Sequence, residues 1–270
     1  QSKTISTFSV ISLIICTNTG SNPYLTERFY FVGLINNIVA SIAPCVIITL
    51  SFLAFIRTWR YNSDTSFSGS MQDAFGGKSG TVIRVMFITA FFNNIIFNCH
   101  DVHKFTKVIT NYLWPNVSLV QSKTLQIYAL TMITVIPTMF AKKFSNLIIY
   151  ANIGNFSLLV TFVIMGIYSY KNIKQVGWNP TGETILYSTD MYNTINCLSY
   201  FILIYYVHPL ICNLAPEMNG TTQGDFVRVS WIANICSWFL NFLSGYIGWF
   251  TFHGTTRGSI CLTLYPDRAL

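Results

Sequence analysis

The sequence predicts an all-α polytopic membrane protein with about seven transmembrane helices. Of its 270 residues, 52% are hydrophobic and only 9% are charged, whereas a soluble domain has about a quarter of its residues charged. The charges divide the chain into apolar stretches close to the roughly 20 residues that cross a bilayer as a helix. Because these stretches are long and continuous rather than alternating, they favour helices over a barrel.

The predicted spans form a single transmembrane domain over residues 1–270. They cover residues 4–26, 29–56, 82–105, 124–141, 144–170, 187–213 and 227–252. The connections hold most of the turn-forming residues and are too short for a separate soluble domain. Pro44 and Pro137 fall inside the second and fourth spans, where neighbouring helices can satisfy the backbone groups that a kink frees.

The basic residues do not orient the chain. Lys and Arg divide equally between the two sides of a seven-span topology, so the positive-inside rule gives no direction. The sequons at Asn116 and Asn219 lie on opposite sides in that topology, so both cannot be glycosylated. The net charge of +7 is scattered over the connections, which suits anionic lipid and gives no argument for nucleic acid. The sequence does not distinguish the plasma membrane from an endolysosomal or vacuolar membrane.

Two spans contain sequences that are poor material for a helix. The first span carries small polar residues followed by Pro23, which lacks an amide hydrogen, and Asn22 before it is pushed out of the helical region. The sixth span carries Tyr205, Tyr206, Val207 and His208 before Pro209. Freed backbone groups are costly against lipid, so such interruptions are expected to be buried in protein or to line a cavity.

Spans one and six are the equivalent members of two repeats of five helices. Transporters built from inverted repeats bind their substrate between two discontinuous helices in such positions. The expected substrate-binding residues are Thr19, Gly20, Ser21, Asn22, Tyr205 and His208. Free amides at the first interruption would hold a carboxylate, and Tyr205 and His208 would face the amino group or side chain. The alternative is that both interruptions are structural and that His208 bonds a carbonyl freed by Pro209.

Several short motifs resemble the amino acid/auxin permease family, which includes the sodium-coupled neutral amino acid transporters. Residues 245–254 (GYIGWFTFHG) are similar to the segment that closes the family's seventh helix, and 260–266 (ICLTLYP) to the motif after it. His208 and Pro209, with Glu217 and Met218 nine residues on, resemble a sixth-helix pattern. Residues 74–76 with Gly80 resemble the loop before the third helix, and 19–21 with Gly33 a "G-S-G" region in which two of the three glycines are replaced.

The resemblance implies the first part of a LeuT-like inverted-repeat (5+5) fold. A complete member has about eleven helices, and whether this chain continues beyond Leu270 with an eighth helix stays open. The implied function is secondary active transport of amino acids or similar small zwitterions by alternating access. The alternative is a non-transporting membrane subunit or nutrient sensor that retains the fold. The expected partners are the amino acid and the lipid bilayer, while protein partners and the coupling ion, sodium or proton, stay open.

The sequence predicts no enzyme and no cofactor. It contains neither a nucleotide-binding glycine loop nor a nucleophile with a placed base. Cys99, His100 and His103 are metal-ligand types at the end of the third span, but without a distant partner cluster they predict an interfacial polar patch and no metal site. Asparagines form polar stripes on the third span (Asn93, Asn94, Asn98) and the sixth (Asn193, Asn196), with helix packing and the lining of a path both open.

Overall fold

The computed structural model describes residues 5–19, 25–58, 66–140, 144–176, 186–206, 208–214 and 223–252, and these contain helices and no strand. The α-helices are α1 (Thr7–Thr19), α2 (Leu25–Val32), α3 (Leu34–Thr58), α4 (Phe67–Phe75), α5 (Ser79–Leu113), α6 (Ser118–Gln121), α7 (Lys123–Phe140), α8 (Ile148–Val176), α9 (Met191–Ile204), α10 (His208–Leu214) and α11 (Gln223–Phe252), and η2 (Phe144–Leu147) is a 3₁₀ turn. The predicted all-α class is confirmed for the described residues.

Three of the described helices are long and apolar enough to cross a membrane. They are α3, most of α8 and most of α11. The outward face of α3 carries exposed apolar side chains, among them Val39, Ile47 and Leu50, as lipid contact requires. Both α3 and α7 continue through their prolines, Pro44 and Pro137, as predicted.

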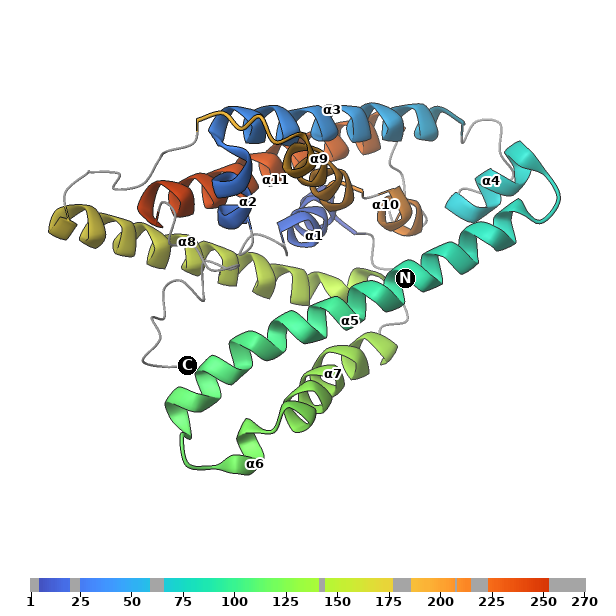
Figure 1. The fold of residues 1–270 in the computed structure, drawn as a ribbon. Helices are drawn as coiled ribbons and strands as arrows, with labels where there is room; N and C mark the ends of the chain where they lie inside the picture. Colours follow the sequence, from blue (N-terminus) through green and yellow to red (C-terminus); the bar gives the residue numbers. More distant parts are fainter. Residues whose placement is uncertain are drawn as a thin grey trace.

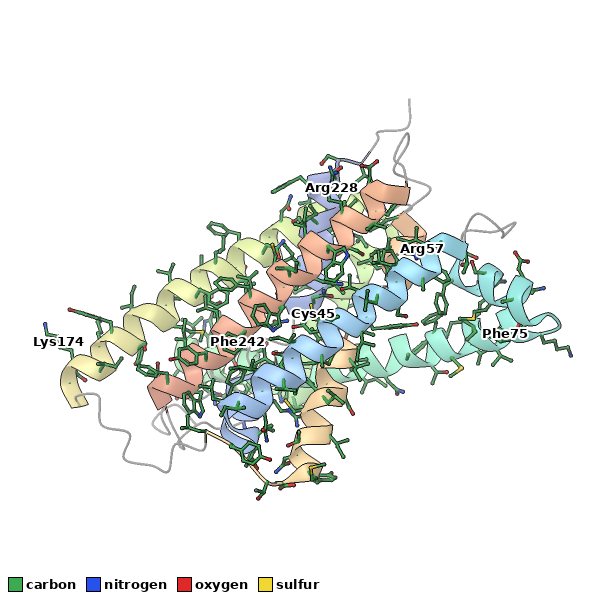
Figure 2. The ribbon with its side chains drawn as sticks, turned by 90° about the horizontal axis from the view of Figure 1, so that it is seen from above. Cys45, Arg57, Phe75, Lys174, Arg228 and Phe242 are labelled. Carbon is green, nitrogen blue, oxygen red and sulfur yellow. The ribbon has the colours of Figure 1, made fainter. Side chains whose placement is uncertain are left out.

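Helix α11 is the centre of the main bundle, and α1, α2, α3 and α8 all pack against it. Figure 1 shows α3 above α11 and α8 below it, with α1 and α9 between, and Figure 2 shows α3, α11 and α8 side by side. Gly245 lies where α11 meets α2, and a Cβ there would collide with the ring of Phe29. The absence of a side chain therefore lets these two helices approach closely, a device typical of membrane helices.

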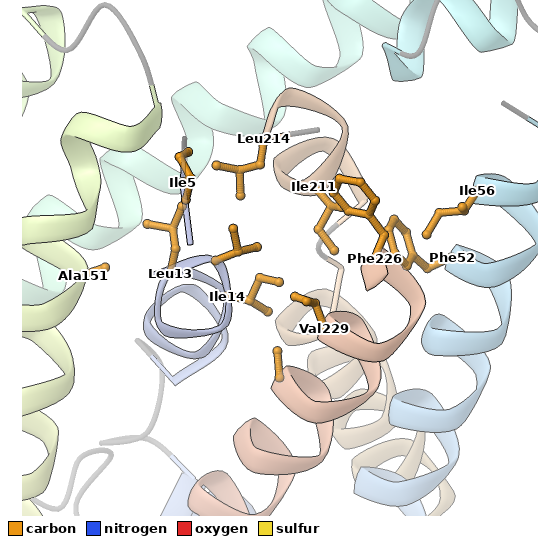
Figure 3. Close-up of a cluster of buried hydrophobic side chains, with 12 residues drawn as sticks. Ile5, Leu13, Ile14, Phe52, Ile56, Ala151, Ile211, Leu214, Phe226 and Val229 are labelled. Atoms are coloured by element: carbon orange, nitrogen blue, oxygen red, sulfur yellow. The ribbon is translucent and has the colours of Figure 1, made fainter. Parts of the chain in front are cut away.

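Two buried apolar clusters hold the bundle together. The first joins α1, α3, α8, α10 and α11 and includes Ile14, Phe52, Ile211 and Val229 (Figure 3). The second joins α2, α3 and α9 and includes Leu25, Phe201 and Tyr205. Close packing of such side chains, rather than their removal from water, stabilises contacts between helices in lipid.

Helices α5 and α7 form an arm beside the bundle and pack on each other. Gln126 of α7 donates to Thr110 Oγ1 of α5 over 2.8 Å and to the Val120 carbonyl oxygen over 2.8 Å. With 35 residues, α5 is about 52 Å long, which exceeds the roughly 30 Å core of a bilayer. Figure 1 shows α5 running away from the bundle toward α6.

Helix is interrupted at the second predicted place, where Tyr205 and Tyr206 are not helical, while the first predicted place, residues 20–23, lies outside the described residues. α1 ends at Thr19 and α2 begins at Leu25, while α9 ends at Ile204 and α10 begins at His208. α1 has 13 residues and α9 has 14, so each is only about 20 Å long. Neither piece alone reaches across a bilayer core of about 30 Å.

The boundary between the first two spans differs from the prediction. The charges Glu27 and Arg28 suggested an end near residue 26, but α2 continues through them to Val32. The chain turns at Gly33, whose φ of 82° is accessible mainly to glycine. The side-chain amide of Asn37 donates to the carbonyl oxygens of Gly33 over 2.8 Å and Arg28 over 3.2 Å, so the end of α2 is capped from α3.

Candidate functional site

A stripe of polar side chains runs along the buried face of α11. Its members share spacings of four and three residues and are almost fully buried: Ser230, Asn234, Ser237, Asn241 and Ser244. This spacing places them on one face of a helix. Amides and hydroxyls inside an apolar bundle are costly unless they are hydrogen-bonded, so the stripe marks where α11 needs polar partners.

The stripe is joined to α1 and α3 by side-chain hydrogen bonds. Asn18 Nδ2 donates to Asn234 Oδ1 over 3.1 Å, and Asn234 Nδ2 donates to Thr49 Oγ1 over 2.9 Å. Thr49 in turn donates to the Cys45 carbonyl oxygen over 2.7 Å. The chain of bonds therefore crosses the bundle from the end of α1 through α11 to α3.

Asn241 connects the two helix interruptions. Its Nδ2 donates to the backbone carbonyl oxygen of Asn18 over 3.1 Å, one residue before α1 ends. The hydroxyl of Tyr205, which follows the last residue of α9, faces the Asn241 side chain. One asparagine on the continuous helix α11 thus lies between the ends of the two interrupted helices.

Several oxygens around Asn241 have no hydrogen-bond partner. They are Asn18 Oδ1, Asn241 Oδ1 and the Tyr205 hydroxyl, all buried. α9 directs its carboxyl-terminal end here, and such an end carries partial negative charge. Among the described residues no Asp, Glu, Lys or Arg side chain is buried. The site is therefore rich in acceptors and suited to a cationic or hydrogen-donating group.

His208 lies in a different environment from Tyr205. Its Nε2 is 3.3 Å from Ser51 Oγ, and its Nδ1 is buried without a partner. The His208 ring is surrounded by aromatic rings, with Tyr206 at 5.2 Å and Phe52 at 5.5 Å between centroids. Tyr205 instead stacks on Phe201 at 6.1 Å and belongs to the second apolar cluster.

Of the six residues proposed from the sequence, three are described, and Tyr205 and His208 lie in different surroundings. Thr19 is buried at the carboxyl end of α1, where its hydroxyl donates to the Ile15 carbonyl oxygen over 2.7 Å, and Tyr205 faces the polar stripe. His208 lies instead among the rings of Phe52 and Tyr206. Gly20, Ser21 and Asn22 lie outside the described residues. The free amides expected at the first interruption belong to residues of which only Thr19 is described, so that expectation stays a prediction.

Sequence reasoning missed the asparagines that form the network. It selected Asn93, whose side chain is exposed on α5, and Asn193, which donates to Asp190 Oδ2 over 2.8 Å at the start of α9. The signal that could have found the network is the regular Ser and Asn spacing on α11. Among the described residues no group of three His, Cys, Asp or Glu side chains could hold a metal ion.

No family model, curated protein sequence or solved structure matches the chain. The described residues form a helical protein with membrane-length apolar helices, a helix interrupted at Tyr205 and Tyr206, and a buried polar site between that interruption and the described end of α1.

Proposed function

We propose that the protein is a secondary active transporter of amino acids or similar small zwitterions. The observation that carries the proposal is the position of Asn241, which bonds the end of α1 and faces the end of α9. Paired interruptions in corresponding helices of two repeats are the best sequence-level indication of a transporter binding site. In this proposal the chain crosses the membrane about seven times and forms the first part of a LeuT-like fold.

The chemistry of the site favours a solute with an ammonium group. Asn18 Oδ1, Asn241 Oδ1 and the Tyr205 hydroxyl are buried oxygens without partners, and an ammonium supplies three donors. The carboxylate of the same solute would lie toward the start of α2, where the first amides of a helix favour negative charge. The ammonium group of a small zwitterion would then lie near Asn18 on α1, and its carboxylate would lie at the amino end of α2.

Transport would proceed by alternating access. The interrupted helices and α11 would move against the arm formed by α5 and α7, which packs mainly on itself. The energy of such a movement must come from different solute affinities in the two states or from a coupled ion, sodium or proton. Tyr205, fully buried on Phe201, occupies the interruption in this conformation and must move for a solute to enter.

The burial of Tyr205 on Phe201 also favours a second candidate function. A membrane subunit or nutrient sensor could keep the interrupted helices and close the site permanently, with Tyr205 as part of the closure. Uptake and binding of radiolabelled amino acids, measured with the full-length protein in proteoliposomes, distinguish the two. Saturable uptake supports the transporter, binding without uptake supports the sensor, and absence of both supports a structural subunit.

A substitution at Gly20 tests the location of the site. Gly20 is the first residue of the predicted interruption after Thr19, and Gly20→Trp would place a large side chain there. The variant should lose solute binding while Gly166→Trp, on α8 where a Cβ meets no atom within 4 Å, should keep it. Unchanged affinity in Gly20→Trp would remove the assignment.

A further inference from the structure

The connection between α3 and α5 contains a short helix, α4, that is built as one unit with α5. Ser66 caps α4 by accepting from the Gly69 amide over 3.0 Å. Gly80 of α5 lies so close to α4 that a Cβ would be 2.8 Å from the Ser68 carbonyl oxygen. Ser79 Oγ donates to the Met71 carbonyl oxygen over 3.0 Å, so α4 moves only together with the start of α5.

Phe67, the first residue of α4, is the point at which this unit reaches the bundle. Its ring centroid lies 5.1 Å from Phe55 of α3, 5.4 Å from Phe87 of α5 and 6.5 Å from His208 of α10. These separations fall in the range of favourable aromatic pairs. Phe67 therefore bridges α3, α5 and α10 at once.

The cluster continues onto the interruption between α9 and α10. Tyr206 lies 5.2 Å from His208 and stacks on Phe87 at 6.4 Å, and His208 also meets Phe52 at 5.5 Å edge to face. The rings of Phe52, Phe55, Phe67, Phe87, Tyr206 and His208 thus form a continuous group, which we call the aromatic cluster. It ties the arm to the joint of the sixth span, where Figure 1 shows α10 near the start of α4.

Helix α10 depends on its surroundings for its position. It has only seven residues, and a helix this short is not stable alone. On one side Ile211 and Leu214 pack into the first apolar cluster (Figure 3). On the other side the His208 side chain has a single described hydrogen bond, to Ser51, and its ring lies among aromatic rings, so aromatic contacts hold this side of the first turn.

We propose that α4 is a latch on α10. With Phe67 in the aromatic cluster, α10 is held against α3. When the α4–α5 unit withdraws Phe67, the first turn of α10 loses a ring contact and α10 is free to turn about the joint at Tyr205 and Tyr206. The device operates whether the bound solute is transported or only sensed.

Native cysteines provide the test, because one lies on α10 and others lie elsewhere in the bundle. Cys212 is buried on α10, while Cys45 on α3 and Cys197 on α9 are buried away from the latch. Labelling of a buried thiol follows the population of locally open molecules. The rate of maleimide labelling at each cysteine would be measured by peptide mass spectrometry on the full chain, in wild type and variants.

Phe67→Ala should raise the labelling rate of Cys212 about tenfold, as expected for the loss of aromatic contacts, and leave Cys45 and Cys197 unchanged. Phe67→Leu keeps more apolar volume than Phe67→Ala and folds more readily, and it should raise the labelling rate of Cys212 by a smaller factor. The matched control is Phe75→Ala at the exposed end of the same helix, which should change nothing. An unchanged rate at Cys212, a parallel rise at Cys45 and Cys197, or an equal effect of Phe75→Ala would overturn the latch.

Discussion

Asn241 Nδ2 donates to the Asn18 carbonyl oxygen over 3.1 Å, across 223 residues of sequence. This bond joins a backbone carbonyl near the described end of α1 to α11. Because the same side chain faces Tyr205 at the end of α9, movement at one interruption alters the contacts of the other. The continuous helix α11 is therefore the element through which the two interruptions are coupled.

The hydrogen bond between α11 and α3 should stabilise the bundle. Thr49→Val keeps the shape of the side chain but leaves Asn234 Nδ2 without its acceptor, so the free energy of unfolding should fall by about 1 kcal/mol. Thr161→Val is the control, because the Thr161 hydroxyl donates only to the Ser157 carbonyl oxygen of its own helix. Thermal unfolding in detergent measures both variants, and equal losses would show that the network contributes nothing beyond the helix.

Removal of the Tyr205 hydroxyl should separate stability from binding. The hydroxyl is buried and has no hydrogen-bond partner, so Tyr205→Phe keeps the stack on Phe201 and should unfold at the same temperature or higher. Amino acid affinity should fall about tenfold, because one hydrogen bond to a charged group is lost. A drop in unfolding temperature with unchanged affinity would show that the hydroxyl serves packing alone.

The contact between α2 and α11 should not tolerate a side chain at Gly245. Gly245→Ala places a methyl group in the ring of Phe29 and should cost about 1–3 kcal/mol, as overpacked cores do. Gly166→Ala on α8 meets no neighbouring atom within 4 Å and should be neutral or slightly stabilising, since alanine favours helix over glycine. Equal unfolding temperatures for the two variants would contradict the close approach of α2 and α11.

The seven-span topology predicts that Asn116 and Asn219 lie on opposite sides of the membrane. Asn116 is exposed in the turn between α5 and α6, and Asn219 lies in the connection before α11. In a eukaryotic expression host at most one of the two sequons should carry a glycan, and Asn116→Gln and Asn219→Gln identify which. Glycans on both would require an even number of spans between the two positions.

The sequence predicted the helices and the second interruption because these depend on local chemistry. Charge spacing set the approximate ends of the apolar stretches, and Pro209 marked the break that follows Ile204, while the break predicted before Pro23 lies outside the described residues. The end of α2 was less predictable, because the caps that Asn37 supplies to Arg28 and Gly33 come from the next helix. A charged pair inside the helix suggested a boundary several residues too early.

The site itself could be predicted only in part. Tyr205 and Tyr206 are neighbours, yet one faces the polar stripe and the other the aromatic cluster, a division that depends on how α9 packs. The Ser and Asn spacing on α11 could be seen in the sequence, but so could the asparagines on α5 and α9, of which Asn93 is exposed and Asn193 bonds the capping residue Asp190. Which polar stripe lies between the interruptions follows from tertiary contacts between helices far apart in sequence.

Equilibrium binding of a radiolabelled amino acid mixture to the purified full-length protein, compared between wild type and Asn241→Leu, tests the central claim most directly. The matched control is Asn93→Leu, on the exposed side of α5. The account predicts saturable binding by wild type and by Asn93→Leu and at least about a tenfold loss in Asn241→Leu, as expected when a buried polar contact to a charged group is removed. Equal binding by all three proteins would contradict it.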